Sequence, residues 1–204
     1  MNGDFDQSAE PALGWRPDGP VRAHAFAERW ASTGRARKWS AMALTALLSG
    51  PFALLAAMYE NTMAGVAAVL LLAAVAPAIE ETVKIAGAAY VAEQRPWLVP
   101  TALVLPVVGL VSGLVFATVE NWWYLTVLVP DPPRDLVAWR WVFGPLVHGT
   151  GSFTAGIGVA VMWRRARESG HRPSFSDAQP WLVAAVVWHG AYNVFAVLLE
   201  FAGR

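Results

Sequence analysis

Two carboxylates and an ammonium lie inside one long apolar segment of this 204-residue sequence. Glu80, Glu81 and Lys84 interrupt a run of small and aliphatic residues that continues on both sides of them. Ionisable groups at such depth in a hydrophobic helix usually mark a functional site. Glu80 and Lys84 have the favourable i, i+4 spacing of a helical ion pair. Glu81 is rotated by about 100° from Glu80 on a helix, so we expect that the two carboxylates cannot point at one spot, and that one works while the other supports it.

Three further apolar segments also carry polar side chains far from their ends. These side chains are Glu120 and Asn121 in one segment, His148 and Ser152 in the next, and His189 and Asn193 in the last. Counted from the expected helix ends, the acids and imidazoles lie roughly 12 to 19 Å from the nearer membrane face. His148 and Ser152, like His189 and Asn193, are four residues apart and so share a helix face. We therefore expect the four segments to bring these groups together near the middle of the membrane.

Two carboxylates and two imidazoles at one depth suit the activation of water. In one reading, a glutamate held ionised near Lys84 takes a proton from water, and His189 with Asn193 donates hydrogen bonds to the oxyanion. In the other reading, the acids and imidazoles bind a zinc ion, which itself acidifies the water. The candidate zinc ligands are Glu80, Glu120, His148 and His189. The residues alone leave both readings open.

Several other catalytic sites are disfavoured by the motifs. The sequence contains neither His-Glu-x-x-His nor Gly-x-Gly-Asp, and its apolar segments hold no aspartate, which argues against zincin-type and presenilin-like sites. The segment Gly149-Thr150-Gly151-Ser152 resembles the surroundings of a rhomboid serine, with His189 as its base, but the Gly-x-Ser-Gly pattern is not matched. With no cysteine in the chain, thiol catalysis, disulfides and cysteine-ligated metals are excluded.

Rival functions from other classes use the same groups. A membrane lipid or acyl-amide hydrolase would need the same acids and imidazoles. A cation- or proton-binding transport module would too, although the internal repeat found in many transporters is not evident. The polar groups would also serve as interhelical hydrogen-bonding partners alone. Four helices with an acid or imidazole at one depth favour chemistry, because each buried ion costs several kcal/mol without a compensating role.

The composition indicates a membrane protein. Hydrophobic residues make up 56% and charged residues 15% of the chain, which is too apolar for a soluble domain. The net charge is zero, so we do not expect nucleic acid as a partner. We predict an all-α, polytopic bundle in the lipid bilayer, with five spans at about 39–59, 62–92, 97–129, 137–163 and 180–201. The second is long enough to tilt or to kink at Pro77, and the fourth is interrupted at Gly144-Pro145.

The N-terminal 38 residues differ from the membrane-embedded catalytic domain predicted for 39–204. Residues 1–20 are polar and contain scattered Gly and Pro, which predicts a disordered tail. Residues 21–38 mix basic and aromatic side chains, which suits either a short helix on an anionic membrane face or a solvated basic linker. With a cytoplasmic N-terminus, the loops inside hold most of the Arg residues, and only Arg134, Arg140 and Arg204 fall outside.

Four motifs in this order resemble the PrsW family of bacterial intramembrane proteases, within the superfamily that includes CAAX-prenyl proteases and bacteriocin-immunity proteins. The motifs are Glu80-Glu81-x-x-Lys84, Phe116-x-x-x-Glu120-Asn121, His148 and His189-x-x-x-Asn193. The resemblance covers roughly residues 70–199. It implies an all-helical peptidase of the cell (inner) membrane that cleaves a single-span protein, typically an anti-sigma factor, near its extracytoplasmic boundary.

The resemblance also implies roles for individual residues. Glu80 and Glu81 would be the catalytic carboxylates, and His148 and His189 would be essential. This chain departs from the CAAX-protease branch in two places: Lys84 follows Glu81 by three residues where that branch has an Arg one residue later, and Glu120 stands where it has a histidine. We therefore do not expect prenylated substrates. The oligomeric state is not indicated by the sequence.

Overall fold

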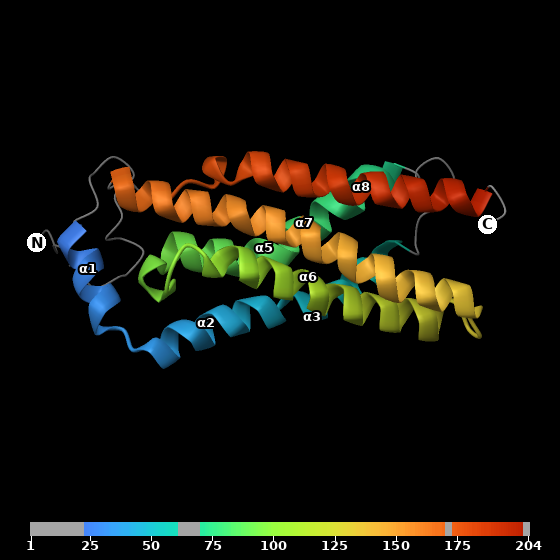
Figure 1. Ribbon diagram of the computed structural model, residues 1–204, viewed down its shortest axis with the longest axis horizontal. Helices are drawn as coiled ribbons and strands as arrows, with labels where there is room; N and C mark the ends of the chain where they lie inside the picture. Colours follow the sequence, from blue (N-terminus) through green and yellow to red (C-terminus); the bar gives the residue numbers. More distant parts are fainter. Residues whose placement is uncertain (1–22, 61–69, 170–172, 202–204) are drawn as a thin grey trace, which may run out of the picture.

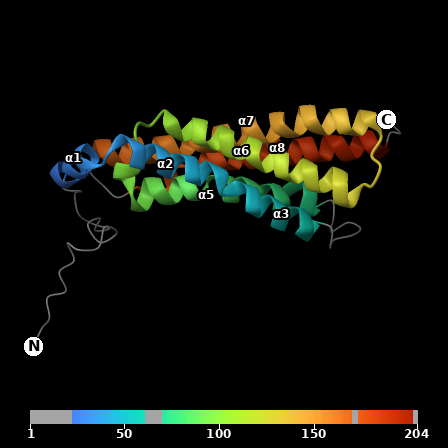
Figure 2. The same cartoon turned by 90° about the horizontal axis from the view of Figure 1, so that it is seen from below.

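The computed structural model describes residues 23–60, 70–169 and 173–201, and all regular structure in them is helical. In chain order the helices are α1 Ala23–Ser32, α2 Arg35–Leu47, α3 Ser49–Glu60, η1 Leu71–Val75, α5 Ala76–Gln94, η2 Pro96–Leu98, α6 Val104–Trp123, η3 Tyr124–Leu128, α7 Arg134–Ser169, η4 Phe175–Asp177 and α8 Gln179–Phe201. The long helices lie side by side, and α1 lies at one end of the bundle (Figures 1 and 2). The predicted all-α fold is confirmed. The predicted tail at 1–20 and the start of the second predicted span lie outside the described residues.

The first predicted span, 39–59, consists of two helices rather than one. α2 ends at Leu47 and α3 begins at Ser49. Pro51 explains the break, because its ring clashes with the carbonyl of Leu47 and it has no N–H to donate to that carbonyl. The expectation of one continuous helix is wrong at this point.

The predicted kink at Pro77 is a π-helical turn. The N–H of Ala76 bonds to the carbonyl of Leu71, five residues back, immediately before Pro77 in the first turn of α5. Pro77 has no N–H to donate to the carbonyl of Ala73, four residues back. That carbonyl faces Gly190 of α8, where a Cβ atom would overlap it. The absence of a side chain at Gly190 lets α8 approach the widened turn closely.

The third predicted span, 97–129, starts later than expected. The first residues of this run form η2, and α6 begins only at Val104 before continuing through η3 to Leu128. Pro96 and Pro100 delay the helix, because proline lacks an N–H and biases the preceding residue away from helical angles. Pro106 falls in the first turn of α6, where a missing N–H is tolerated.

The fourth predicted span is not interrupted. α7 has 36 residues and passes through Pro145 without ending, so the expected break at Gly144-Pro145 is wrong. Proline inside a helix costs about 3 kcal/mol, and contacts of α7 with α5, α6 and α8 offset this loss. Gly144 lets α7 pack closely on α6, because a Cβ there would lie 3.2 Å from the Asn121 amide of α6. The fifth predicted span, 180–201, agrees with α8.

Glycines bring α6 and α7 into close contact. A Cβ atom at Gly109 would overlap the carbonyl oxygen of Ser152, and one at Gly113 would overlap that of His148. The two glycines have the small-xxx-small spacing that favours close approach of membrane helices. This packing fixes the backbone of His148 against α6.

Replacing Gly113 with Ala is expected to destabilise the protein by about 1–3 kcal/mol, because the added methyl group must push apart two helix backbones. Thermal unfolding in detergent measures the effect. Gly34→Ala is the matched control, since a Cβ at Gly34 meets nothing within 4 Å among the described residues. Equal stability of the two variants would contradict the close α6–α7 contact.

The basic and aromatic segment predicted at 21–38 contains α1 and the start of α2. The indole nitrogen of Trp30 donates to the carbonyl of Val99 at 3.0 Å, and Lys38 Nζ donates to the carbonyl of Trp30 at 2.6 Å. The guanidinium of Arg29 lies 5.0 Å from the ring centre of Trp97. These contacts tie α1 to the turn before α6.

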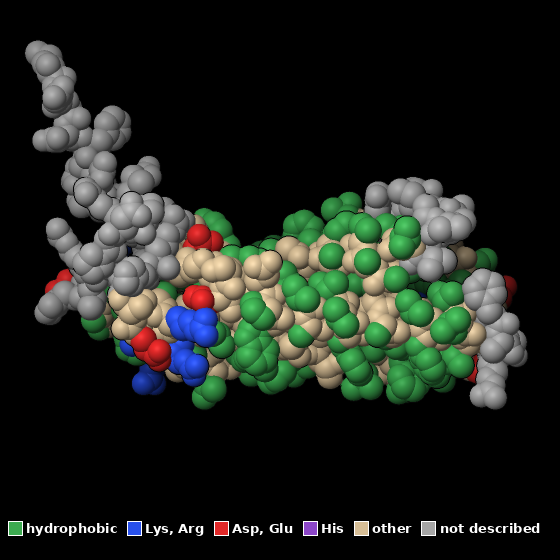
Figure 3. Space-filling view, turned by 90° about the horizontal axis from the view of Figure 1, so that it is seen from above, with side chains coloured by type: hydrophobic (Ala, Val, Ile, Leu, Met, Phe, Trp, Pro, Cys, Tyr) green, Lys and Arg blue, Asp and Glu red, His purple; other side chains and the backbone are tan. Residues whose placement is uncertain are grey.

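The outer surface is largely apolar. Large hydrophobic side chains such as Leu70, Leu103 and Val187 are more than half exposed. On the face shown in Figure 3, hydrophobic side chains cover the middle of the bundle, and Lys and Arg side chains gather towards one end. In the described part of the chain, two helical stretches, Val104–Leu128 and Gln179–Leu199, are long and apolar enough to cross a membrane. Such a surface suits contact with lipid.

Candidate active site

Four helices bring the polar groups singled out from the sequence to one place in the interior. α5 supplies Glu80, Glu81 and Lys84, α6 supplies Glu120 and Asn121, α7 supplies His148 and Ser152, and α8 supplies His189. Most of these side chains are buried, and Glu120 is partly buried with 17% of its side chain exposed. The prediction that these polar groups lie close together inside the bundle is confirmed for the side chains named here.

Lys84 is the centre of the cluster. Its Nζ lies 2.8 Å from Glu81 Oε1 and 3.3 Å from Glu80 Oε2, and it donates to His148 Nδ1 at 2.6 Å. The expectation that the two carboxylates cannot point at one spot is therefore wrong. Positions three and four residues before a helical residue lie on either side of it, so Glu81 and Glu80 reach one ammonium from two sides.

Both oxygens of Glu81 are occupied. Oε1 contacts His189 Nδ1 at 3.0 Å as well as Lys84, and Oε2 accepts a hydrogen bond from Ser152 at 3.0 Å. A Cβ at Gly151 would come within 3.3 Å of Oε2, so the glycine makes room for the carboxylate. An ionised carboxylate only accepts hydrogen bonds, so Nδ1 of His189 carries the hydrogen and Nε2 is its basic nitrogen.

His148 is held from both sides of its ring. An ammonium only donates, so Nδ1 accepts from Lys84 and Nε2 carries the hydrogen. Nε2 lies 2.8 Å from Glu120 Oε2, which has no other donor among the described residues. The ring packs against Phe116 at 5.4 Å and against His189 at 4.6 Å between centres. The orientation of His148 is thus fixed by a contact at each ring nitrogen.

Arg140 is part of the cluster, although the sequence placed it in the outer loop. Its Nη2 donates to Glu120 Oε1 and its Nε to Asn121 Oδ1, each at 3.0 Å. The amide of Asn121 donates back to the Arg140 carbonyl at 2.8 Å, and the guanidinium lies 3.9 Å from the ring centre of Tyr124. A signal was present: positions 140, 144 and 148 follow one another at i, i+4 spacing and so face the same neighbour.

Asn193 lies on the same helix as His189 but contacts the π-helical turn. Its Nδ2 donates to the carbonyl of Leu72 at 2.9 Å. The NH₂ group of an Asn side chain has two hydrogens, so one more N–H is available for donation. The contact fixes α8 to the turn that precedes the two glutamates.

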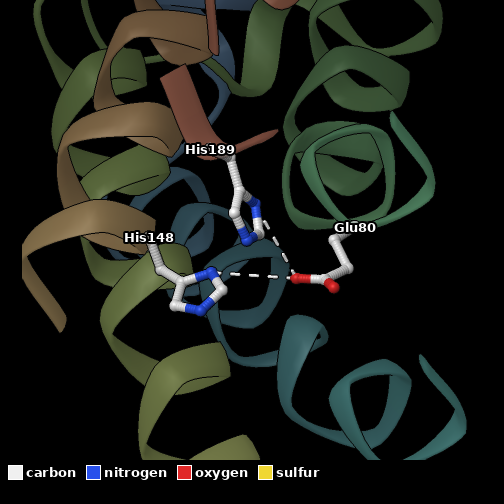
Figure 4. A group of neighbouring side chains, drawn as sticks. All are labelled: Glu80, His148 and His189. Carbon is white, nitrogen blue, oxygen red and sulfur yellow. Dashed lines mark ion pairs between the residues drawn. The ribbon is translucent and has the colours of Figure 1, made fainter. Parts of the chain in front are cut away.

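Three residues have the arrangement of a metal site. One ligand atom each from Glu80, His148 and His189 lies within 4.8 Å of the others. Glu80 Oε2 is 3.8 Å from His148 Nδ1 and 3.9 Å from His189 Nδ1 (Figure 4). Two imidazoles and one carboxylate are a common ligand set of catalytic zinc, so these residues fit such an ion. Glu120, the fourth ligand expected, approaches the opposite nitrogen of His148.

Comparison with known proteins agrees with this geometry. The PrsW family intramembrane metalloprotease domain matches residues 36–203, which includes every helix that contributes to the cluster. No curated protein and no solved structure gives a significant match to the chain. Because the match covers most of the sequence, the chain belongs to the PrsW family of intramembrane metalloproteases, and it is a peptidase.

Proposed function

We propose that this peptidase hydrolyses a peptide bond of a single-span membrane protein, of the anti-sigma-factor kind, at the cluster of Glu80, His148 and His189. One ligand atom from each of these three side chains lies within 4.8 Å of the others inside the bundle, and this convergence carries the proposal. A peptide bond reaching this depth must come from a chain that itself enters the membrane. The resemblance to the family adds the expectation that the bond lies near the extracytoplasmic boundary.

Glu80 is the general base in this proposal, and Glu81 is a positioning group. Glu81 accepts hydrogen bonds from three donors, Lys84, Ser152 and His189. Glu80 Oε2 lies 3.3 Å from Lys84 Nζ and faces two imidazole nitrogens at 3.8 and 3.9 Å, beyond direct hydrogen-bond distance, so we place the water beside this oxygen. A water held there gives its proton to Glu80 as its oxygen bonds to the carbonyl carbon. The C–N bond then breaks, and the proton passes to the leaving amine.

The remaining groups orient the reactants. The second N–H of Asn193 donates to the negative charge on the carbonyl oxygen, and His189 adds a donor only when its Nε2 also carries a proton, while its Nδ1 stays bonded to Glu81. Glu120 orients His148 through the 2.8 Å contact of its Oε2 with Nε2, and so helps to place the ring beside the water at Glu80. A metal ion held by Glu80, His148 and His189 would polarise the carbonyl and acidify water.

The proposed setting is a five-span, multi-pass protein of the cell (inner) membrane with a cytoplasmic N-terminus. α7 alone extends about 54 Å at 1.5 Å per residue, more than the roughly 30 Å of a bilayer core. It therefore projects beyond the membrane. Its C-terminal end carries Arg164, Arg165 and Arg167, which the positive-inside rule places in the cytoplasm. α1, with its basic and aromatic side chains, lies on the same face in this proposal.

Purified protein in lipid nanodiscs, mixed with a pool of single-span membrane proteins, tests the proposal. We expect release of peptides cut within or next to the membrane segment, detected by mass spectrometry. Release of fatty acids or headgroups from the nanodisc lipids, with no peptide, would contradict it and favour an amide or lipid hydrolase. Uptake of cations by proteoliposomes without any hydrolysis would favour transport.

Arg140→Lys is expected to lower kcat by about 10–100-fold, the usual cost of losing a group that orients an active-site residue. A lysine has one nitrogen and cannot donate to Glu120 and Asn121 from two atoms as Arg140 does. Initial cleavage rates at saturating substrate measure the effect. Arg134→Lys, at the exposed start of the same helix, is the control. Full activity of Arg140→Lys would show that the two hydrogen bonds of Arg140 to Glu120 and Asn121 are not needed for catalysis.

A further inference from the structure

The side chain of Lys84 contacts two of the three residues that could bind a metal ion. Its Nζ is 2.6 Å from His148 Nδ1 and 3.3 Å from Glu80 Oε2, side-chain atoms of two of the three candidate ligand residues. The side chain is fully buried, and its Nζ also lies 4.1 Å from the ring centre of Phe116. The lysine therefore already supplies a cation to this part of the site.

We propose that Lys84 competes internally with divalent metal ions for the site formed by Glu80, His148 and His189. The inference rests on the function proposed above, because it assigns a role to that same site. A metal ion bound to Nδ1 of His148 would have to displace the hydrogen bond from Lys84. Two positive charges would also face each other in the buried interior, where their repulsion is weakly screened.

Lys84 also has one partner outside the group of candidate ligands. Glu81 Oε1 lies 2.8 Å from Nζ, and Glu81 is outside the group of candidate ligands. Lys84 can thus withdraw from His148 and Glu80 while it keeps one carboxylate partner. Metal binding and the lysine contact with His148 exclude each other, so the position of Lys84 sets the affinity for metal.

Zinc affinity of the full-length protein in nanodiscs, measured by competition with a fluorescent chelator, tests the inference. We expect Lys84→Met to bind Zn²⁺ at least tenfold more tightly than wild type. Lys84→Arg keeps the positive charge and should show no such gain. The matched control is Lys38→Met at the only other lysine of the chain, which lies at the end of the bundle. Adding His148→Ala to Lys84→Met should abolish the gain.

A second variant covers the case in which Lys84→Met does not fold without metal. Glu81→Gln combined with Lys84→Met removes one negative and one positive charge, so the net charge of the buried cluster is unchanged. It should also bind Zn²⁺ at least tenfold more tightly than wild type. The melting temperature of either variant should rise more on zinc addition than that of wild type.

Equal zinc affinity in wild type and in a folded variant without Lys84, or tighter binding by wild type, would overturn the inference. Peptide cleavage measured on the same samples separates this result from the proposed function. If wild type cleaves substrate while zinc affinity is the same in all variants, the role of Lys84 fails and the proposed function stands. If zinc affinity rises as expected while wild type cleaves nothing, the role of Lys84 stands and the proposed function fails.

Discussion

Replacing Glu80 with Gln lowers kcat by about 10²–10⁴-fold, the contribution of a positioned general base. Gln has nearly the shape of Glu and still accepts a hydrogen bond from Lys84, but it cannot take a proton from water. The substitution also leaves Lys84 its closer carboxylate, Glu81, at 2.8 Å. The protein should therefore fold normally while the chemical step fails.

The comparison uses kcat measured on one cleaved single-span substrate in nanodiscs. Glu168→Gln is the control, because Glu168 lies on the exposed end of α7 with 67% of its side chain accessible. Glu81→Gln separates the two carboxylates, since its effect should include a loss of stability that Glu80→Gln does not show. A folded Glu80→Gln variant with wild-type kcat would mean that Glu80 is not the base.

Glu81→Leu is expected to lower the free energy of unfolding by about 3–5 kcal/mol, the cost of removing one partner of a buried ion pair. The change removes the shortest ion-pair contact of Lys84 and leaves Ser152 and His189 without their acceptor. Because all of these groups are buried, water cannot replace the lost contacts. Equilibrium unfolding in mixed detergent micelles measures the difference.

Ser152→Ala provides the scale for this experiment. It removes only the hydrogen bond to Glu81 Oε2 and should cost about 1.5–3 kcal/mol, as for hydrogen bonds to charged groups. If Glu81→Leu were no more destabilising than Ser152→Ala, the pair of Glu81 and Lys84 would contribute little to the fold. The description of Glu81 as the group that holds the cluster together would then be wrong.

The clustering of the polar side chains could be predicted from the sequence, because ionisable groups deep in apolar helices almost always face the interior of the bundle. The i, i+4 spacing predicted that His148 and Ser152 share a helix face. In the structure both side chains face α5, where His148 contacts Lys84 and Ser152 donates to Glu81. The apolar runs also predicted α8 closely. These features depend on local periodicity alone.

Features that depend on contacts between helices escaped prediction. Whether a proline ends a helix depends on what packs beside it: Pro51 follows a break, whereas α7 continues through Pro145. Arg140 was placed outside because the charge rule counts residues near helix ends, yet its guanidinium reaches Glu120 across the α6–α7 contact. The joint approach of Glu80 and Glu81 to Lys84 was not predicted. The two acids point about 100° apart on the helix, but Lys84, three and four residues later, lies between them and contacts both.

The most direct test of the account is cleavage of a single-span substrate in nanodiscs prepared in H₂¹⁸O, with the products analysed by mass spectrometry. Hydrolysis by water activated at Glu80 predicts one ¹⁸O in the new C-terminal carboxyl group of the wild-type product. It also predicts almost no product from Glu80→Gln. Labelled product formed at the same rate by wild type and Glu80→Gln, or no peptide product from any single-span protein, would contradict the account.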